Sequence, residues 1–287
     1  MPWRHVGRRT RTAEPPRRWR SKRRWALALV ALVALAVLAQ AAYGTLYLVH
    51  HRGSVVAATY GLGAVTALAD AVPDGSWEIC CSHSVSAEAG HLRFELRASD
   101  DRVAGGWRSE LALRRGAFGR DERYCFDVRL PAAYADRPPV TIAQWHAIPD
   151  RIFGEGGRPP PLRIVVADGR WHLALNEDPR WLSGLALFGS EPLAGRALWT
   201  GPVRWRTWAR WCVEVRWDPE GGGRVRARLD DAVVADWRGT TGYRDLLAPY
   251  FKLGVYVPQA DTLPDGQWSA DVRGLVVDLS KDEPTDG

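Results

Sequence analysis

From residue 76 onward the chain alternates apolar and polar residues in short runs, and clusters of Gly, Pro and Asp separate the runs. A period of two is typical of strands that bury one face, whereas helices need a period of 3.6. We expect about nine to twelve strands in one antiparallel sandwich or jelly roll. Nine runs show the pattern most clearly: 92–98, 107–113, 124–130, 141–147, 162–167, 211–217, 224–230, 250–257 and 272–279.

Alternation also predicts which side chains share a face of a strand. In 250–257, the residues at odd positions from Phe251 to Val257 form an unbroken apolar row, so the opposite face presents a dedicated polar surface. Gly254 on that face lacks a side chain and would let a ligand approach the backbone. The same alternation predicts three sets of residues that each share one face of a strand. They are Arg108 with Glu110, Gln144 with His146 and Ile142, and Tyr250 with Lys252, Gly254 and Tyr256.

The segment before this region contains 25 residues without a charge, Trp25 to Val49. As a helix it would extend about 37 Å, enough to cross a hydrocarbon core of about 30 Å. Residues 1–24 hold ten Lys or Arg, which should keep the N-terminus cytoplasmic and the C-terminal domain outside. The alternative is a cleaved signal peptide, with Ala39-Gln40-Ala41 as the cleavage site and secretion as the result.

The predicted organisation therefore has five parts. They are a basic cytoplasmic tail (1–24), a transmembrane signal-anchor or signal peptide (25–49), a juxtamembrane linker (50–75), the β domain (76–280) and a flexible tail (281–287). The formal charge is +6, and the first 24 residues carry +9, so the remaining residues are slightly acidic. We therefore expect no nucleic-acid partner.

Four cysteines are too few for a disulfide scaffold and lack zinc-ligand spacing. An exported domain permits disulfides, but the pairing of Cys80, Cys81, Cys125 and Cys212 stays open.

Three of the polar strands carry motifs that resemble the jelly-roll polysaccharide lyases. RSEL lies at 108–111, QWH at 144–146 and YFKLGVY at 250–256, in the order found in alginate lyases of this fold. The chain is also similar to the heparin-lyase-I-like and glucuronan-lyase-like group, through YCFDVRLP, PPPLRIVVADGRW and WCVEVRW. The resemblance covers roughly 92–280 and implies a concanavalin-like β-jelly-roll sandwich, which would follow the one N-terminal transmembrane helix that the uncharged segment predicts.

The resemblance implies a lyase that cleaves a uronic-acid-containing polysaccharide by β-elimination. Such an enzyme removes the proton alpha to a carboxylate, so it must neutralise that carboxylate and stabilise an enolate-like dianion. Arg108 and Gln144 would bind the carboxylate, and His146 would act as base or as a further donor. Tyr256 would protonate the leaving oxygen, and a second option is that it also takes the first proton. These four residues would be catalytic.

Four further residues are expected to bind substrate: Lys252, Glu110, Tyr250 and Trp181. Lys252 would draw an anionic polymer into the groove, and Trp181, in the long segment 176–206, would stack on a sugar or form part of a lid. The chemistry requires no metal, although a structural calcium is possible by the resemblance, and we expect a monomer. The alternative function is a non-catalytic carbohydrate-binding module of the same fold.

Overall fold

The computed structural model describes residues 17–51, 77–88, 90–131, 138–181, 194–257 and 266–279. Three predicted parts lie wholly or mostly outside the described residues: residues 1–16 of the basic tail, residues 52–75 of the linker, and the tail 281–287. The first unit holds helix α1 (Arg17–His51). Its segment Trp25–Thr45, with mean hydropathy 2.3, is long and apolar enough to span a membrane, a property that signal sequences share.

The described residues of the second unit form fourteen strands, and each of the nine predicted runs lies largely within one of them. Five strands lie outside those nine runs: β1 and β2, which are very short, and β8, β9 and β12. The strands are β1 (Trp77–Glu78), β2 (Val85–Glu88), β3 (His91–Arg97), β4 (Trp107–Arg115), β5 (Asp121–Arg129), β6 (Val140–His146), β7 (Leu162–Ala167), β8 (Arg170–Asp178), β9 (Ala194–Pro202), β10 (Ala209–Arg216), β11 (Asp218–Leu229), β12 (Ala232–Tyr243), β13 (Tyr250–Val257) and β14 (Gln267–Leu279). A short 3₁₀ helix, Arg151–Phe153, follows β6.

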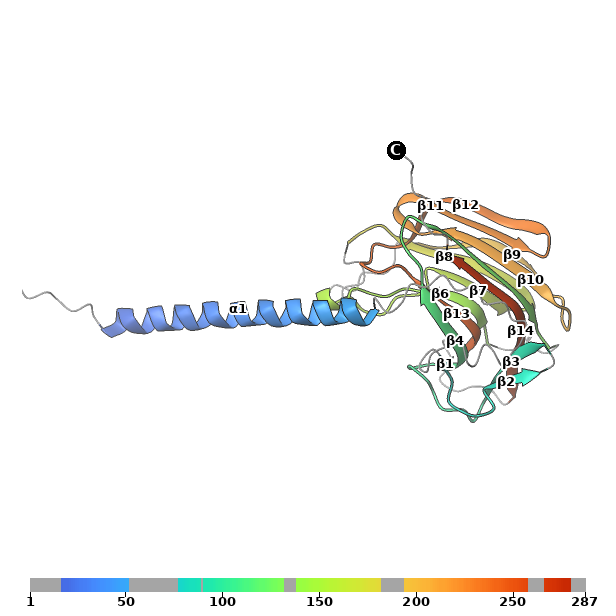
Figure 1. Cartoon of the computed structure of the whole chain (residues 1–287), viewed down its shortest axis with the longest axis horizontal. Coiled ribbons are helices and arrows are strands. Elements are labelled where there is room, and N and C mark those ends of the chain that lie inside the picture. The colour runs from blue at the N-terminus through green and yellow to red at the C-terminus, as the bar shows by residue number, and fades with distance from the viewer. Residues whose placement is uncertain are drawn as a thin grey trace, which may run out of the picture. The chain divides into compact units, whose positions relative to one another are not determined.

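The strands form two layers, as the predicted sandwich requires (Figure 1). One layer has the order β1-β4-β13-β6-β7-β8, with β9 also paired to β8, and the other has the order β12-β11-β10-β5-β14-β3-β2. A short parallel pairing of β12 with β8 joins them, and the other pairings are antiparallel. The catalytic candidates all lie on the first layer, on β4, β13 and β6.

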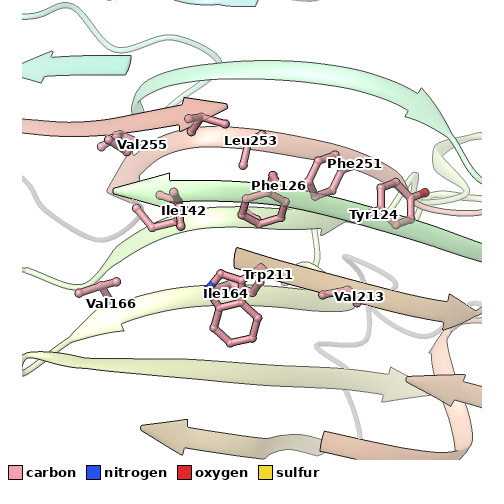
Figure 2. Packing of buried hydrophobic residues seen from close by; sticks show 14 of the residues in the cluster. Tyr124, Phe126, Ile142, Ile164, Val166, Trp211, Val213, Phe251, Leu253 and Val255 are labelled. Atoms are coloured by element: carbon pink, nitrogen blue, oxygen red, sulfur yellow. The ribbon is translucent and has the colours of Figure 1, made fainter. Parts of the chain in front are cut away.

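Aromatic and branched side chains from both layers fill the space between them (Figure 2). Tyr124 of β5 contacts Trp145 of β6 edge-on, with ring centroids 5.3 Å apart, and Phe251 of β13 at 4.8 Å. The predicted apolar row from Phe251 to Val257 is confirmed, since each member is almost fully buried. Burying one such side chain contributes about 1.5–3 kcal/mol, so this row fixes which face of β13 points away from the core.

One predicted face and one predicted strand boundary are wrong. Ile142 lies in the core and not beside Gln144 and His146, because the register of β6 against β7 shifts between Thr141 and Ala143. Such a bulge inserts an extra residue and reverses the alternation beyond it. In addition, the cluster 218–223, one of the Gly, Pro and Asp clusters expected to separate strands, instead begins β11.

The interpretation of Gly254 also changes. Its φ is +150°, and a Cβ there would lie 2.2 Å from the carbonyl oxygen of Ser109 on β4. The residue is therefore glycine because the backbones of β13 and β4 approach closely, and the missing side chain does not leave room for a ligand.

The structure resolves the cysteine pairing that the sequence left open. Cys125 of β5 and Cys212 of β10 are cross-strand partners and form one disulfide. Cys80 and Cys81, adjacent in the chain, form the other.

Candidate active site

The sheet brings the polar motif residues together on three neighbouring strands. β13 is the middle strand, with β4 on one side and β6 on the other. Directly opposite residues in an antiparallel pair have Cβ atoms about 4.5–5.5 Å apart. The cross-strand pairs are Tyr256 with Arg108, Gly254 with Glu110, Lys252 with Gln144, and Tyr250 with His146.

The centre of this surface is an ion-pair network around Glu78, a residue that sequence analysis did not identify. One carboxylate oxygen of Glu78, Oε2, accepts hydrogen bonds from Nη1 of Arg108 and from Nζ of Lys252, both at 2.7 Å. Burial by itself would raise the pKa of Glu78, but the charges and hydrogen bonds of Lys252 and Arg108 outweigh it and hold the pKa below its ordinary value. Two cations thus converge on one carboxylate.

Glu110 and Gln144 lie beneath this network. Both are 0% exposed, and Nε2 of Gln144 donates to Oε1 of Glu110 at 2.6 Å. Nη1 of Arg108 lies 3.3 Å from Glu110 Oε2. Burial raises the pKa of the Glu110 carboxyl, against the opposing charges of Lys252 and Arg108. Two cations, Arg108 and Lys252, therefore face two carboxyl groups, Glu78 and Glu110, within this network.

His146 has the properties of a neutral base. Its Nδ1 lies 2.8 Å from the carbonyl oxygen of Ala147 and, as the donor in that contact, would leave Nε2 as the acceptor nitrogen. Burial, with a further contribution from the charge of Lys252, lowers the pKa of His146 to about 4. The imidazole is therefore uncharged near neutral pH.

The two tyrosines of the YFKLGVY motif occupy different positions along β13. The guanidinium of Arg108 lies 4.3 Å from the ring centroid of Tyr256, whereas the ring of Tyr250 lies 5.3 Å from that of His146. Burial raises the pKa of both phenols, so both remain protonated at neutral pH. Arg108 acts electrostatically on all three of His146, Tyr250 and Tyr256. One cation thus acts on the candidate base, on the candidate acid Tyr256 and on Tyr250, which was expected to bind substrate.

Comparison with known proteins decides the class of this site. The model of the family described as "Polysaccharide lyase" matches residues 78–276, which include every residue of the network. The chain belongs to this polysaccharide lyase family. No curated protein matches the chain.

Solved structures support the fold of the lyase. An endo-β-1,4-glucuronan lyase from the fungus Trichoderma reesei superposes with a TM-score of 0.55 and 18% identity, over 73% of this chain and 93% of that one. A family 7 alginate lyase, A1-II′, in complex with substrate gives a TM-score of 0.51 and 14% identity, over 71% and 85%. At these identities the likeness establishes a shared jelly-roll sandwich.

Among the described residues of the lyase, Trp181 contacts Arg244, which is not a member of the ion-pair network. Its side chain is 52% exposed, and the guanidinium of Arg244 lies 4.7 Å from its ring centroid. Part of the segment 176–206 is strand and not loop, since β8 extends to Asp178 and β9 spans Ala194–Pro202. Residues 182–193 lie outside the described part of the chain.

The structure also gathers carboxylates that no sequence spacing indicated. Carboxylate oxygens of Asp150, Glu155 and Asp245 lie within 4.8 Å of one another, and all three residues are buried. The guanidinium of Arg158 contacts both Glu155 and Asp245, and the backbone N–H of Leu246 donates to Asp150 at 3.1 Å. A structural calcium fits this group poorly, because Arg158 already supplies the positive charge and donors occupy the oxygens.

Proposed function

We propose that this lyase cleaves a uronic-acid-containing acidic polysaccharide by β-elimination. The observation that carries the proposal is the convergence of Arg108 and Lys252 on the carboxylate of Glu78. A site that holds a carboxylate between two cations has the charge needed to bind and neutralise the carboxylate of a uronic acid.

The proton-transfer groups flank that position. Tyr256 lies on the Arg108 side, and His146 interacts most strongly with the charge of Lys252. In the proposed reaction, Nε2 of His146 takes the proton alpha to the carboxylate, a carbon–carbon double bond forms, and the bond to the leaving oxygen breaks. The phenol of Tyr256 protonates that oxygen. One proton is removed from the substrate and one is returned to it, so the reaction needs neither water nor an oxidant.

The burial of the network assigns different tasks to its members. Arg108 and Lys252 are 5% and 2% exposed, so Glu78 covers them from solvent, and a substrate carboxylate must displace it or share its donors. Gln144 is fully buried against Glu110, and we assign it to positioning that carboxyl rather than to contact with substrate. The half-buried residues His146, Tyr250 and Tyr256 remain for contact with the sugar.

The test is a screen of uronate polymers for the unsaturated product. The ultraviolet absorbance of that product is the readout. Glucuronan and alginate come first, because structurally similar lyases are named for these polymers, and heparin-like chains and bacterial capsules follow. We expect at least one polymer to give an unsaturated end. A chain that binds a polymer and never releases such a product would be a carbohydrate-binding module instead.

We further propose that α1 anchors the lyase in the cell membrane, with the C-terminal domain outside. The support is the uncharged segment Trp25–Thr45 preceded by arginines. The full-length protein should stay in the membrane fraction, and protease added to intact cells should digest residues 76–287. A mature protein that starts near Ala42 and is recovered from the medium would show secretion after cleavage.

A further inference from the structure

The cysteines of this chain divide into two pairs that differ in what they can do for the fold. Cys125 and Cys212 are 87 residues apart in sequence and join two neighbouring strands. Cys80 and Cys81 are adjacent, with Cα atoms 3.7 Å apart, and the chain has no other cysteine with which they can pair.

Chain entropy separates the two bonds. A disulfide stabilises a fold mainly by closing a loop in the unfolded chain, and the effect grows with the length of that loop. The Cys125–Cys212 bond closes a long loop, whereas the Cys80–Cys81 bond closes almost none. Stabilisation of the fold therefore does not account for Cys80 and Cys81, which are also both partly exposed.

Two metal-ligating side chains lie near this pair, with Asp100 beside Cys81 and His83 beside Asp100. Oδ1 of Asp100 lies 3.8 Å from Sγ of Cys81 and 2.9 Å from Nε2 of His83. The ligand atoms of Cys80, Cys81 and Asp100 all lie within 4.8 Å of one another. Two sulfurs, one imidazole nitrogen and one carboxylate oxygen are a donor set for zinc.

Three of these donors are already grouped as a tetrahedral site requires, since the ligand atoms of Cys80, Cys81 and Asp100 lie within 4.8 Å of one another, whereas the imidazole of His83 touches Asp100 and has to move toward the sulfurs to complete the site. Zinc bonds of about 2.0–2.3 Å place ligand atoms about 3.3–3.8 Å apart at the corners of a tetrahedron. The Asp100–Cys81 distance already falls near this range, and the His83–Asp100 distance is slightly shorter. The backbone N–H of Arg97 donates to Oδ2 of Asp100 at 2.8 Å, which leaves Oδ1 for His83 and Cys81. Such an outer hydrogen bond orients a ligating carboxylate.

We propose that Cys80, Cys81, His83 and Asp100 form a redox-gated site for a thiophilic divalent cation of the zinc class. The disulfide form cannot ligate, because the thiolate is the ligand. A dithiol reductant transfers two electrons and two protons to the bond, gives two thiols and is itself oxidised to a disulfide. The cation then binds both sulfurs as thiolates and releases two protons.

Cadmium provides the probe, because its thiolate complexes absorb in the ultraviolet. The full-length protein is reduced mildly under nitrogen, freed of reductant and titrated with Cd²⁺. We expect two thiols per chain, with Cys125–Cys212 intact by peptide mapping because Cys125 is buried. One equivalent of cadmium should produce the charge-transfer band, and the oxidised protein should produce none.

Variants identify the two other ligands. His83→Ala combined with Asp100→Asn should weaken cadmium binding at least about tenfold, since even partners of metal ligands change affinity by about 10–100-fold. His172→Ala, which alters a histidine on β8, is the matched control and should bind as the parent does. If the double variant does not fold, His83→Ala alone serves, because His83 is partly exposed and its side chain contacts Asp100.

Three results would overturn the proposal. They are a reduced protein without the band, a His83 variant with parental affinity, and equal binding by the oxidised protein. None of them depends on whether the chain cleaves a polysaccharide.

Discussion

Both carboxylate oxygens of Glu78 lie within 2.7 Å of the ammonium nitrogen of Lys252. Lys252 is almost fully buried, and Glu78 comes from β1, a strand of only two residues at the edge of the sheet. The main anionic partner of this buried cation therefore lies on one of the smallest elements of the fold.

Substitution of Glu78 by Gln should change binding and stability in opposite directions. The neutral amide should compete less with a substrate carboxylate, so the KM for the cleaved polymer should fall about three- to tenfold. The loss of a charged acceptor should lower the free energy of unfolding by about 1–3 kcal/mol. Steady-state kinetics and urea denaturation measure the two effects. A raised KM would show that Glu78 helps to bind substrate.

Substitution of Tyr256 by Phe keeps the ring and removes the hydroxyl. Turnover should fall by about 10²–10⁴, the usual contribution of a positioned proton donor, while polymer binding is retained. Tyr250→Phe is the matched control, because Tyr250 is also a half-buried phenol of β13, beside His146. It should lower turnover less than about tenfold. If the two effects are reversed, Tyr250 is the general acid.

The low pKa of His146 predicts where activity is lost in acid. An imidazole must be unprotonated to accept a proton, so kcat/KM should fall as the pH drops through about 4 and His146 becomes protonated. On the alkaline side, the pKa of Tyr256 is raised above the ordinary value of a tyrosine. Activity that depends on its proton should therefore persist to a higher pH than for an ordinary tyrosine. Measurement of kcat/KM against pH, with tryptophan fluorescence to monitor folding, checks both limits. An acid limb near 6.5 would contradict the environment described for His146.

Gly106 keeps space for the proposed acid. A Cβ at this position would lie 2.6 Å from Cε2 of Tyr256 and 3.1 Å from Nη2 of Arg108. Gly106→Ala should therefore displace Tyr256 and lower turnover at least about tenfold, since misplacement of about 1 Å can cost about 10²-fold. Gly157→Ala is the control, because a Cβ there meets nothing within 4 Å. Parental turnover in Gly106→Ala would mean that Tyr256 tolerates displacement.

The buried carboxylates predict a stability that rises in mild acid. Burial raises the pKa of Asp245 to about 7 and that of Asp150 to about 6. The folded state therefore holds more protons than the unfolded state between about pH 4 and 7, and the free energy of unfolding should increase as the pH falls from 8 to 5. The slope is at most about 1.4 kcal/mol per pH unit for each group.

Asp245→Asn should flatten this pH dependence in denaturation experiments. Asp121→Asn, at a side chain that is 70% exposed, should leave it unchanged. A variant of Asp245 with the parental slope would assign the effect to other groups, of which Glu122 is the first candidate, because burial raises its pKa to about 7.

The sequence was sufficient to predict several features: nine of the strands, the apolar row of β13, the apolar N-terminal segment and the motif residues. Each is a local property, because a strand that buries one face must alternate whatever it pairs with. The shared faces of Arg108 with Glu110 and of Lys252 with Tyr256 followed from the same period. The motifs and their order on these strands pointed to the polysaccharide lyases, which the family model confirms.

Only the tertiary structure decided what these residues touch. Glu78 was missed because a two-residue strand has no period, and its contact with Lys252 joins positions 174 residues apart. The bulge that buries Ile142, the pairing of Cys125 with Cys212 and the meeting of Asp150, Glu155 and Asp245 likewise depend on strand register and neighbours. These are non-local properties, set by the packing of the whole sandwich, and alternation along one strand carries no information about them.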